Sequence, residues 1–190
     1  TLVGHSAPAF ARPFEIGGVE GVANVELSYG MLVRVEDRDD DLVAVANGGD
    51  ARSANFDDAT LNYDEGVVSN MLQASGEVGL RWRFLGAYAR GIGFYDFESE
   101  LSDRERTDIS SGADRYVGKH AELRDYYLDA RFRVRGMPLQ LRLGDQVLNW
   151  GESTFIQGGI NTINPIDVAT LRTAGAELQD AFLPVNMIWG

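Results

Sequence analysis

Five stretches of this sequence place an apolar residue at every second position, which predicts β-strands with two chemically different faces. The stretches are residues 22–35, 71–84, 87–97, 123–135 and 139–148. The connections between them are alternately short and long. That rhythm is typical of bacterial outer-membrane barrels, in which short periplasmic turns alternate with long external loops. The pattern therefore predicts an all-β fold, an antiparallel up-and-down transmembrane β-barrel.

The lengths of the connections indicate how the strands follow one another. The second and third stretches are separated by Leu85–Gly86, and the fourth and fifth by Gly136–Pro138. Both segments predict tight turns, because glycine accepts the backbone conformations that such turns need. The remaining connections, 36–70, 98–122 and 149–184, are long. We expect the first two to be external loops, with a short helix near residues 113–117.

One face of the predicted strands is apolar, and we expect it to meet lipid. Its most informative members are Leu72, Val78, Leu80, Leu128, Phe132, Leu141 and Leu143. In a structure without lipid, these side chains are expected to be exposed on a convex surface. Aromatic residues gather toward both ends of the strands, as in the two interfacial girdles of a barrel. The faces of stretch 87–97 are left unassigned, because small residues occupy one side of it.

The opposite face is polar and predominantly basic, and we expect it to line the lumen. Its candidate residues are Glu26, Arg34, Glu77, Arg81, Arg83, Asp129, Arg131, Arg133 and Arg142. Cross-strand pairs of arginine and carboxylate would brace such a wall. An excess of arginine would also favour anionic or carboxylate-bearing solutes. For a single strand, a solvated face of a soluble sandwich is the simpler interpretation.

Composition excludes several classes of protein. The chain has 190 residues, no cysteine and a formal net charge of −12. Disulfides and thiol chemistry are therefore absent, and the acidic balance argues against a nucleic-acid partner. No apolar run is long enough for a transmembrane helix, but a barrel strand needs only about 9–11 residues to cross the membrane.

The two ends of the chain suggest how it is organised. Residues 1–11 contain Ala9–Ala11, a small-x-small pattern that precedes signal-peptidase cleavage, and we interpret this segment as a signal-peptide remnant. An ordinary apolar N-terminal arm is the alternative. Residues 12–190 are expected to form the N-terminal part of one barrel domain that is truncated at its C-terminus, because Val185–Trp189 begins a strand.

The third long connection is too apolar for an external loop, so we expect residues 149–184 to fold back along the polar face as a constriction. Glu152 or Asp167 is expected to meet Arg131, Arg133 or Arg142. Asp167 lies two residues after Pro165 and can also cap a helix-like stretch. The candidate constriction residues are Glu152, Phe155, Gln157, Asn161, Asn164 and Asp167.

No catalytic, cofactor-binding or metal-binding residues are predicted. Gly151–Ser153 does not match a nucleophile elbow, which needs glycine on both sides of the serine. The histidines are His5 and His120, so a catalytic triad is poorly supported. The acidic residues of 36–70 do not have the spacing of an EF-hand loop.

The connection after the fifth stretch also carries a resemblance. Residues 150–161, WGESTFIQGGIN, and 164–168, NPIDV, resemble a family of Gram-negative outer-membrane proteins that is catalogued as a domain of unknown function. Residues 61–66, 94–97 and 113–118 look like further motifs of that family. The resemblance implies a large single-chain barrel with a signal peptide, encoded near a periplasmic lipid-carrier-like protein and an inner-membrane exporter. It supplies no substrate and no catalytic residue.

These observations predict a channel or transporter of the bacterial outer membrane that passes hydrophobic, lipid-like or carboxylate-bearing compounds. Its partners would be outer-membrane lipid and lipopolysaccharide, with the periplasmic carrier and the exporter as further partners implied by the resemblance. A secreted β-sandwich binding module and an outer-membrane enzyme are the alternatives. A sandwich would stay soluble without detergent, and an enzyme would need a convergent nucleophile and base.

Overall fold

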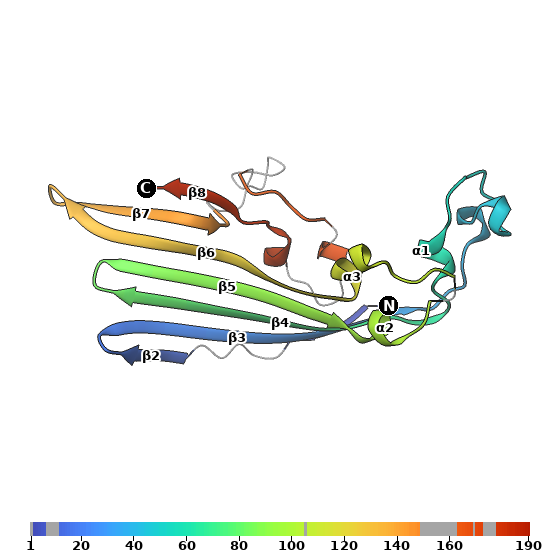
Figure 1. Cartoon of the computed structure of the whole chain (residues 1–190), viewed down its shortest axis with the longest axis horizontal. Helices are drawn as coiled ribbons and strands as arrows, with labels where there is room; N and C mark the ends of the chain where they lie inside the picture. Colours follow the sequence, from blue (N-terminus) through green and yellow to red (C-terminus); the bar gives the residue numbers. More distant parts are fainter. Residues whose placement is uncertain (1, 7–11, 105, 149–162, 169, 173–177) are drawn as a thin grey trace.

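The computed structural model describes residues 2–6, 12–104, 106–148, 163–168, 170–172 and 178–190. These residues form one antiparallel sheet (Figure 1). Its strands are β1 Leu2–Ser6, β2 Arg12–Ile16, β3 Val19–Arg34, β4 Gly66–Trp82, β5 Leu85–Asp96, β6 Lys119–Val134, β7 Met137–Gln146 and β8 Val185–Trp189. The order is β1-β3-β4-β5-β6-β7-β8, and β2 also pairs with β3, so β1 and β2 lie along the same edge.

The five predicted strands and their antiparallel meander are confirmed as β3 to β7. The main difference lies at the start of β4, which begins at Gly66, earlier than residue 71. Gly66 pairs with Arg34 at the end of β3, so the pairing of β3 with β4 extends beyond the predicted start of the strand at residue 71. A register shift between Leu32 and Val33 marks an irregularity in that extension.

The tight turns lie nearer the N-terminus than predicted: the first starts two residues earlier, and the second starts one residue earlier and has two residues instead of three. They are Arg83–Phe84 and Arg135–Gly136, because Trp82 already pairs with Leu85, and Val134 with Met137. Arg135 and Gly136 have φ angles of 51° and 84°, the left-handed pair found in two-residue hairpin turns. Gly17 and Gly18, between β2 and β3, have 59° and 80°. We call this side of the sheet the turn end.

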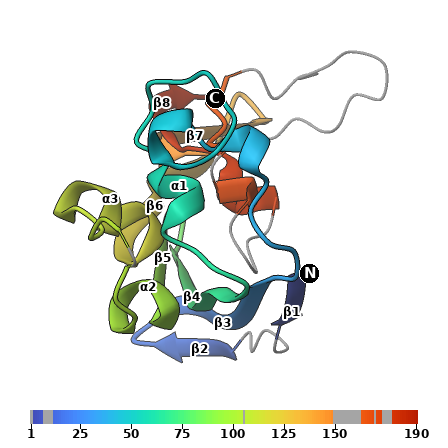
Figure 2. The same cartoon turned by 90° about the vertical axis from the view of Figure 1, so that its right-hand side faces the viewer.

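The sheet is curved, and its two faces are unlike. Figure 2 looks along the strands and shows them curving around a concave side. The apolar residues of the alternating pattern are exposed on the convex face: Leu128 is 64 % exposed and Leu143 is 54 % exposed. Leu72, Leu80, Phe132 and Leu141 are exposed as well, while Val78 is half-buried. The predicted convex exposure is therefore confirmed for most of that set.

Register assigns the faces of β5, which the sequence leaves open. Tyr88 lies opposite Gly79 of β4, and Arg90 lies opposite Glu77. Because residues that lie directly opposite share a face, Tyr88, Arg90, Ile92 and Phe94 belong to the polar, concave face. The side chains of Tyr88, Phe94 and Tyr127 therefore do not belong to convex aromatic girdles, although they lie near the expected levels.

Short helices gather at the other end of the strands, which we call the loop end (Figure 1). They are η1 Asp40–Leu42, η2 Val45–Asn47, α1 Asp58–Leu61, α2 Phe97–Leu101 and α3 Ser111–Val117, the last of which confirms the helix expected near 113–117. The first two long connections contact one another there, because Asn62 Oδ1 accepts from the backbone N–H groups of Arg106 and Thr107 at 2.9 Å. No helix among the described residues has the length and apolar character needed to cross a membrane.

The described part of the third long connection contains two 3-10 turns, η3 Thr170–Arg172 and η4 Leu178–Ala181. Its neck is closed by an antiparallel bridge between Ile166 and Phe182, and Asp167 N–H donates to Ala181 O at 2.7 Å. In Figure 2 the described, orange to red residues between 163 and 184 lie on the concave side of the sheet.

Candidate functional site

Asp180 fixes the third connection to the concave face. Its carboxylate accepts from Arg90 of β5 at 2.5 Å and from Gln73 Nε2 of β4 at 3.0 Å. Its backbone carbonyl accepts from Arg124 of β6. Asp180 is 2 % exposed, so these contacts replace water around a buried charge. Three neighbouring strands therefore hold Asp180: β4 and β5 bind its carboxylate, and β6 binds its backbone carbonyl.

An irregularity in β6 supplies one of those contacts. The pairing of β5 with β6 shifts register between Ala89 and Gly91, so Arg90 meets an extra residue on the partner strand. Arg124 and Asp125 lie in this bulge. Arg90 is 4.0 Å from Asp125, and Arg124 pairs with Glu122 at 3.0 Å. The bulge therefore brings a second arginine to Asp180 and surrounds the docking point with compensating charge.

Asn164 joins the two ends of the same connection. Its side-chain amide donates to Gln146 O at 3.0 Å and to Leu183 O at 2.9 Å, and its Oδ1 accepts from Leu148 N–H at 2.8 Å. The residue is buried. Asn164 was predicted to line a constriction; the structure places it at the base of the connection, where it fixes how the chain leaves β7 and returns to β8.

Of the other predicted constriction residues, the structure describes Asp167. Asp167 accepts from the backbone N–H of Thr170 at 3.4 Å, as expected for a capping residue. Asp180, which is not among the predicted constriction residues, contacts the concave arginines Arg90 and Arg124. Glu152, Phe155, Gln157 and Asn161 lie outside the described residues.

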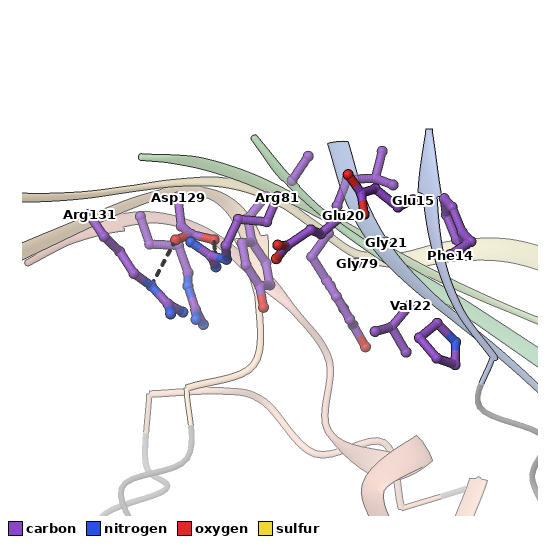
Figure 3. Close-up of a pocket in the computed structure, with 15 residues that line it drawn as sticks. Phe14, Glu15, Glu20, Gly21, Val22, Gly79, Arg81, Asp129 and Arg131 are labelled. Atoms are coloured by element: carbon purple, nitrogen blue, oxygen red, sulfur yellow. Dashed lines mark hydrogen bonds and ion pairs between the residues drawn. The ribbon is translucent and has the colours of Figure 1, made fainter. Parts of the chain in front are cut away.

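A cavity of about 670 Å³ lies on the concave face at the turn end (Figure 3). Asp129 of β6 lines this cavity and is 6 % exposed. Its carboxylate is 3.2 Å from Arg131 Nε and 3.5 Å from Arg81, the two dashed contacts of Figure 3. Gly86 of β5 lies opposite, and a Cβ there would approach Asp129 Oδ1 to 2.2 Å, so the position must be glycine for this carboxylate to lie as it does.

Aromatic rings form the floor of this cavity. The rings of Tyr88 and Tyr127 are stacked, with centroids 5.0 Å apart. The Arg142 guanidinium lies 4.0 Å from the Tyr127 ring centroid and 5.1 Å from that of Trp189. Both distances suit a cation–π contact. Trp189 is itself fixed, because its indole N–H donates to Gln146 Oε1 at 2.9 Å.

The structure brings Arg81, Asp129, Arg131 and Arg142 together at this cavity. Glu77 lies further along the concave face, where it accepts from Tyr88 Oη at 2.5 Å and from Asn24. Arg34 donates to Tyr63 O at 2.8 Å and so ties the end of β3 to the first long connection. Arg83 occupies a tight turn beside Trp82, and Arg133 is exposed near the turn end. Glu26 lies in β3, opposite Ser75.

Several concave residues were missed by sequence reasoning. Arg90 and Tyr88 belong to the strand whose faces were ambiguous, and Arg124 lies in a bulge that breaks the alternation. Asp180 belongs to a connection that has no periodic signal. The i, i+2 relation of Tyr88 and Arg90 was a usable clue, because an arginine in such a pair favours the polar face.

A smaller cavity of about 290 Å³ lies among the loop-end segments. There, a hydrogen bond from the Lys119 ammonium group lowers the pKa of Glu100. The pKa of the neighbouring Asp114 is raised, because its carboxyl group shares a hydrogen bond with Glu100. Within the described residues, no three histidine, aspartate or glutamate side chains are arranged to hold a metal ion.

Comparison with known proteins places the chain in a family and gives no function. No curated protein and no solved structure matches it. A family profile, described as "Protein of unknown function (DUF1302)", matches residues 1–190. The chain thus belongs to the DUF1302 family of proteins of unknown function.

Proposed function

We propose that this chain forms part of the wall of an outer-membrane β-barrel that acts as a channel or transporter for hydrophobic, lipid-like or carboxylate-bearing compounds. In this proposal the convex face meets lipid, the concave face lines the lumen, and the third connection narrows it. The turn end is then periplasmic and the loop end external.

The observation that carries the proposal is the inversion of the two faces. Leucines such as Leu128 and Leu143 are exposed on the convex face, while Gln73, Arg124 and Asp129 are buried on the concave face. Water-soluble proteins bury apolar residues and expose charges. A surrounding hydrocarbon phase removes the conflict, because it solvates leucine and not arginine.

The strands support the same interpretation. β3, β4 and β6 have 16, 17 and 16 residues, and each exceeds the ~9–11 residues that a tilted transmembrane strand needs. Unpaired backbone groups at a sheet edge are costly in lipid, so we propose that the edges formed by β8 and by β1 with β2 are paired in a closed barrel. Outer-membrane lipid and lipopolysaccharide would surround it, and a periplasmic lipid-carrier-like protein and an inner-membrane exporter are its proposed partners in transport.

Asp180 offers a direct test of the constriction. Asp180→Leu removes the acceptor for Arg90 and Gln73, so the third connection should leave the concave face and single-channel conductance in a planar bilayer should rise. Asp64→Leu is the matched control, because Asp64 pairs with Arg38 at 3.0 Å on an exposed loop-end segment. That variant should conduct as the parent protein does.

A second variant removes the obstruction without depending on one ion pair. The neck at Ile166 and Phe182 is already closed, so residues 168–180 can be replaced by Asn-Gly while the bridge is kept. Conductance should rise further than in Asp180→Leu. Unchanged conductance in both variants would contradict the constriction, and a protein that remains soluble without detergent would favour the β-sandwich alternative.

A further inference from the structure

We propose that the cavity at the turn end binds an anionic amphiphile, with its carboxylate or phosphate group held by Arg142. This inference rests on the proposed function for the direction in which such a compound would move. The binding chemistry itself rests on the side chains of the cavity, and it deepens the proposal by naming the class of solute.

Three arginines lie around the single carboxylate of Asp129, and two of them contact it. Arg81 and Arg131 both contact its carboxylate, at 3.5 Å and 3.2 Å. Arg142 lies directly opposite Asp129 on β7, yet in the described part of the chain no carboxylate pairs with it. One carboxylate therefore serves two arginines, and a third arginine faces the same cavity without an anion.

The surroundings of Arg142 define how an anion can approach. The guanidinium lies over the rings of Tyr127 and Trp189, and these contacts do not use its N–H groups, which point outward in the guanidinium plane. Its Nε is buried and has no hydrogen-bond partner among the described residues. An acceptor must then approach in the plane of the guanidinium, at its edge. Carboxylate and phosphate groups fit this fork with two oxygens, whereas a single-point acceptor leaves part of it unsatisfied.

The rest of the cavity suits an apolar body. The stacked pair Tyr88 and Tyr127 offers a flat surface next to Arg142, and Gly79 leaves room above the Tyr88 ring. Val22 and Pro13 line the far side. The volume of about 670 Å³ lies within the ~300–1,000 Å³ typical of small-molecule sites.

Acidic residues limit the anion to one side. Glu15 of β2 and Glu20 of β3 line the cavity on the side away from β7, and Figure 3 shows them apart from Asp129 and Arg131. From β3 to β6 the sheet advances by three strand spacings, or about 14 Å. The head group is therefore held at β6 and β7, and the apolar body extends across the tyrosines toward Val22.

Binding of dodecanoate to the protein in a neutral detergent tests the site. Titration calorimetry should show saturable binding of dodecanoate and much weaker binding of dodecanol, which has the same chain and no charge. Arg142→Met should weaken dodecanoate roughly 10- to 100-fold, the expected loss for a charged hydrogen-bonding group. Arg133→Met is the matched control: Arg133 is an arginine of the neighbouring strand β6 near the turn end, but it does not line the cavity, so binding should be unchanged.

Two further measurements distinguish the source of the anion and the role of Arg142. Inorganic phosphate should compete only at much higher concentration than dodecanoate, because it lacks the apolar body. Arg142→Lys should fall between the parent protein and Arg142→Met, since lysine keeps the charge and loses the planar fork. Circular dichroism and thermal melting of each variant show that the sheet is intact.

Equal affinity for dodecanoate and dodecanol, or unchanged binding in Arg142→Met, would overturn the proposal. Phosphate that competes as well as dodecanoate would overturn the amphiphile and leave a small-anion site. These measurements use neither a current nor a gradient, so a channel without dodecanoate binding, or dodecanoate binding without a channel, identifies which of the two proposals has failed.

Discussion

The convex and concave faces of the sheet are built from the same strands but obey different rules. On the convex face each side chain acts almost independently, and leucines such as Leu128 are exposed. On the concave face the side chains form a connected network in which Gln146 is 1 % exposed and Asp180 is 2 % exposed. The first face is defined by hydropathy and the second by specific partners.

This difference teaches what each face requires from the chain. An apolar surface in contact with hydrocarbon needs only residues of the right polarity, because lipid adapts to their shape. A buried polar surface needs each charge and amide to find a partner, since an unsatisfied group costs about 1–3 kcal/mol. On the convex face, any substitution that keeps the side chain apolar should therefore be tolerated. On the concave face, a substitution should be tolerated only if it keeps the hydrogen bonds and ion pairs of the residue that it replaces.

The largest effect is expected at Asp180. Asp180→Leu leaves Arg90 and Gln73 without their carboxylate acceptor, and breaking a buried ion pair by removing one partner costs about 3–5 kcal/mol. Hydrogen exchange of residues 178–184 should rise strongly, while exchange in β3 stays low. Protection that persists in this variant would mean that the concave network does not depend on the carboxylate.

Leu128→Arg tests the convex face. If Leu128 lies near the bilayer midplane, arginine there should destabilise the protein by roughly 2–4 kcal/mol, as measured by denaturant unfolding from lipid vesicles. Leu128→Ile is the control and should change little, because polarity alone is at stake. If Leu128→Arg is as stable as the parent protein, Leu128 does not face lipid, and the proposed difference between the two faces is contradicted at this position.

Asn164→Ala tests the base of the third connection independently of the contacts that Asp180 makes with the concave face. The substitution leaves Leu148 N–H without its acceptor and removes two donors, so a loss of about 1–3 kcal/mol is expected. Asn164→Asp keeps the acceptor for Leu148 but places a carboxylate oxygen against the carbonyl groups of Gln146 and Leu183, so it should not recover that loss. Exchange of the Leu148 amide is the direct measurement, and an unchanged rate in the alanine variant would contradict the proposed clamp.

The smallest effect concerns the loop end, which belongs to neither face. Hydrogen bonds from Asn47 and from the Ala44 backbone N–H lower the pKa of Asp57 below its usual 3.8. Because the folded-state pKa is lowered, the stabilisation is present above the usual value and is lost as pH falls through the folded pKa. Acid should therefore loosen residues 44–61 before either face of the sheet, as seen by amide exchange. Asp57→Asn should abolish that pH dependence.

The sequence by itself determined the strands and most of their faces. Alternation is a local property, so it located the five central strands and assigned Leu72, Leu128 and Leu143 to one side without knowledge of the partners. It also located helix α3, whose Ser110 cap accepts from Ala113 N–H. It did not place the turns correctly, because the register between strands, which fixes Trp82 opposite Leu85 and Val134 opposite Met137, is not a local property of the sequence.

The tertiary structure alone decided the concave network. Asp180 and Gln73 are separated by 107 residues, and no local pattern marks them as partners. Arg124 reaches the same point because β6 bulges opposite Arg90, and the faces of β5 follow from its pairing with β4. The physical reason is that polarity can be read along the chain, whereas the satisfaction of buried charges depends on register between strands and on where a long connection returns.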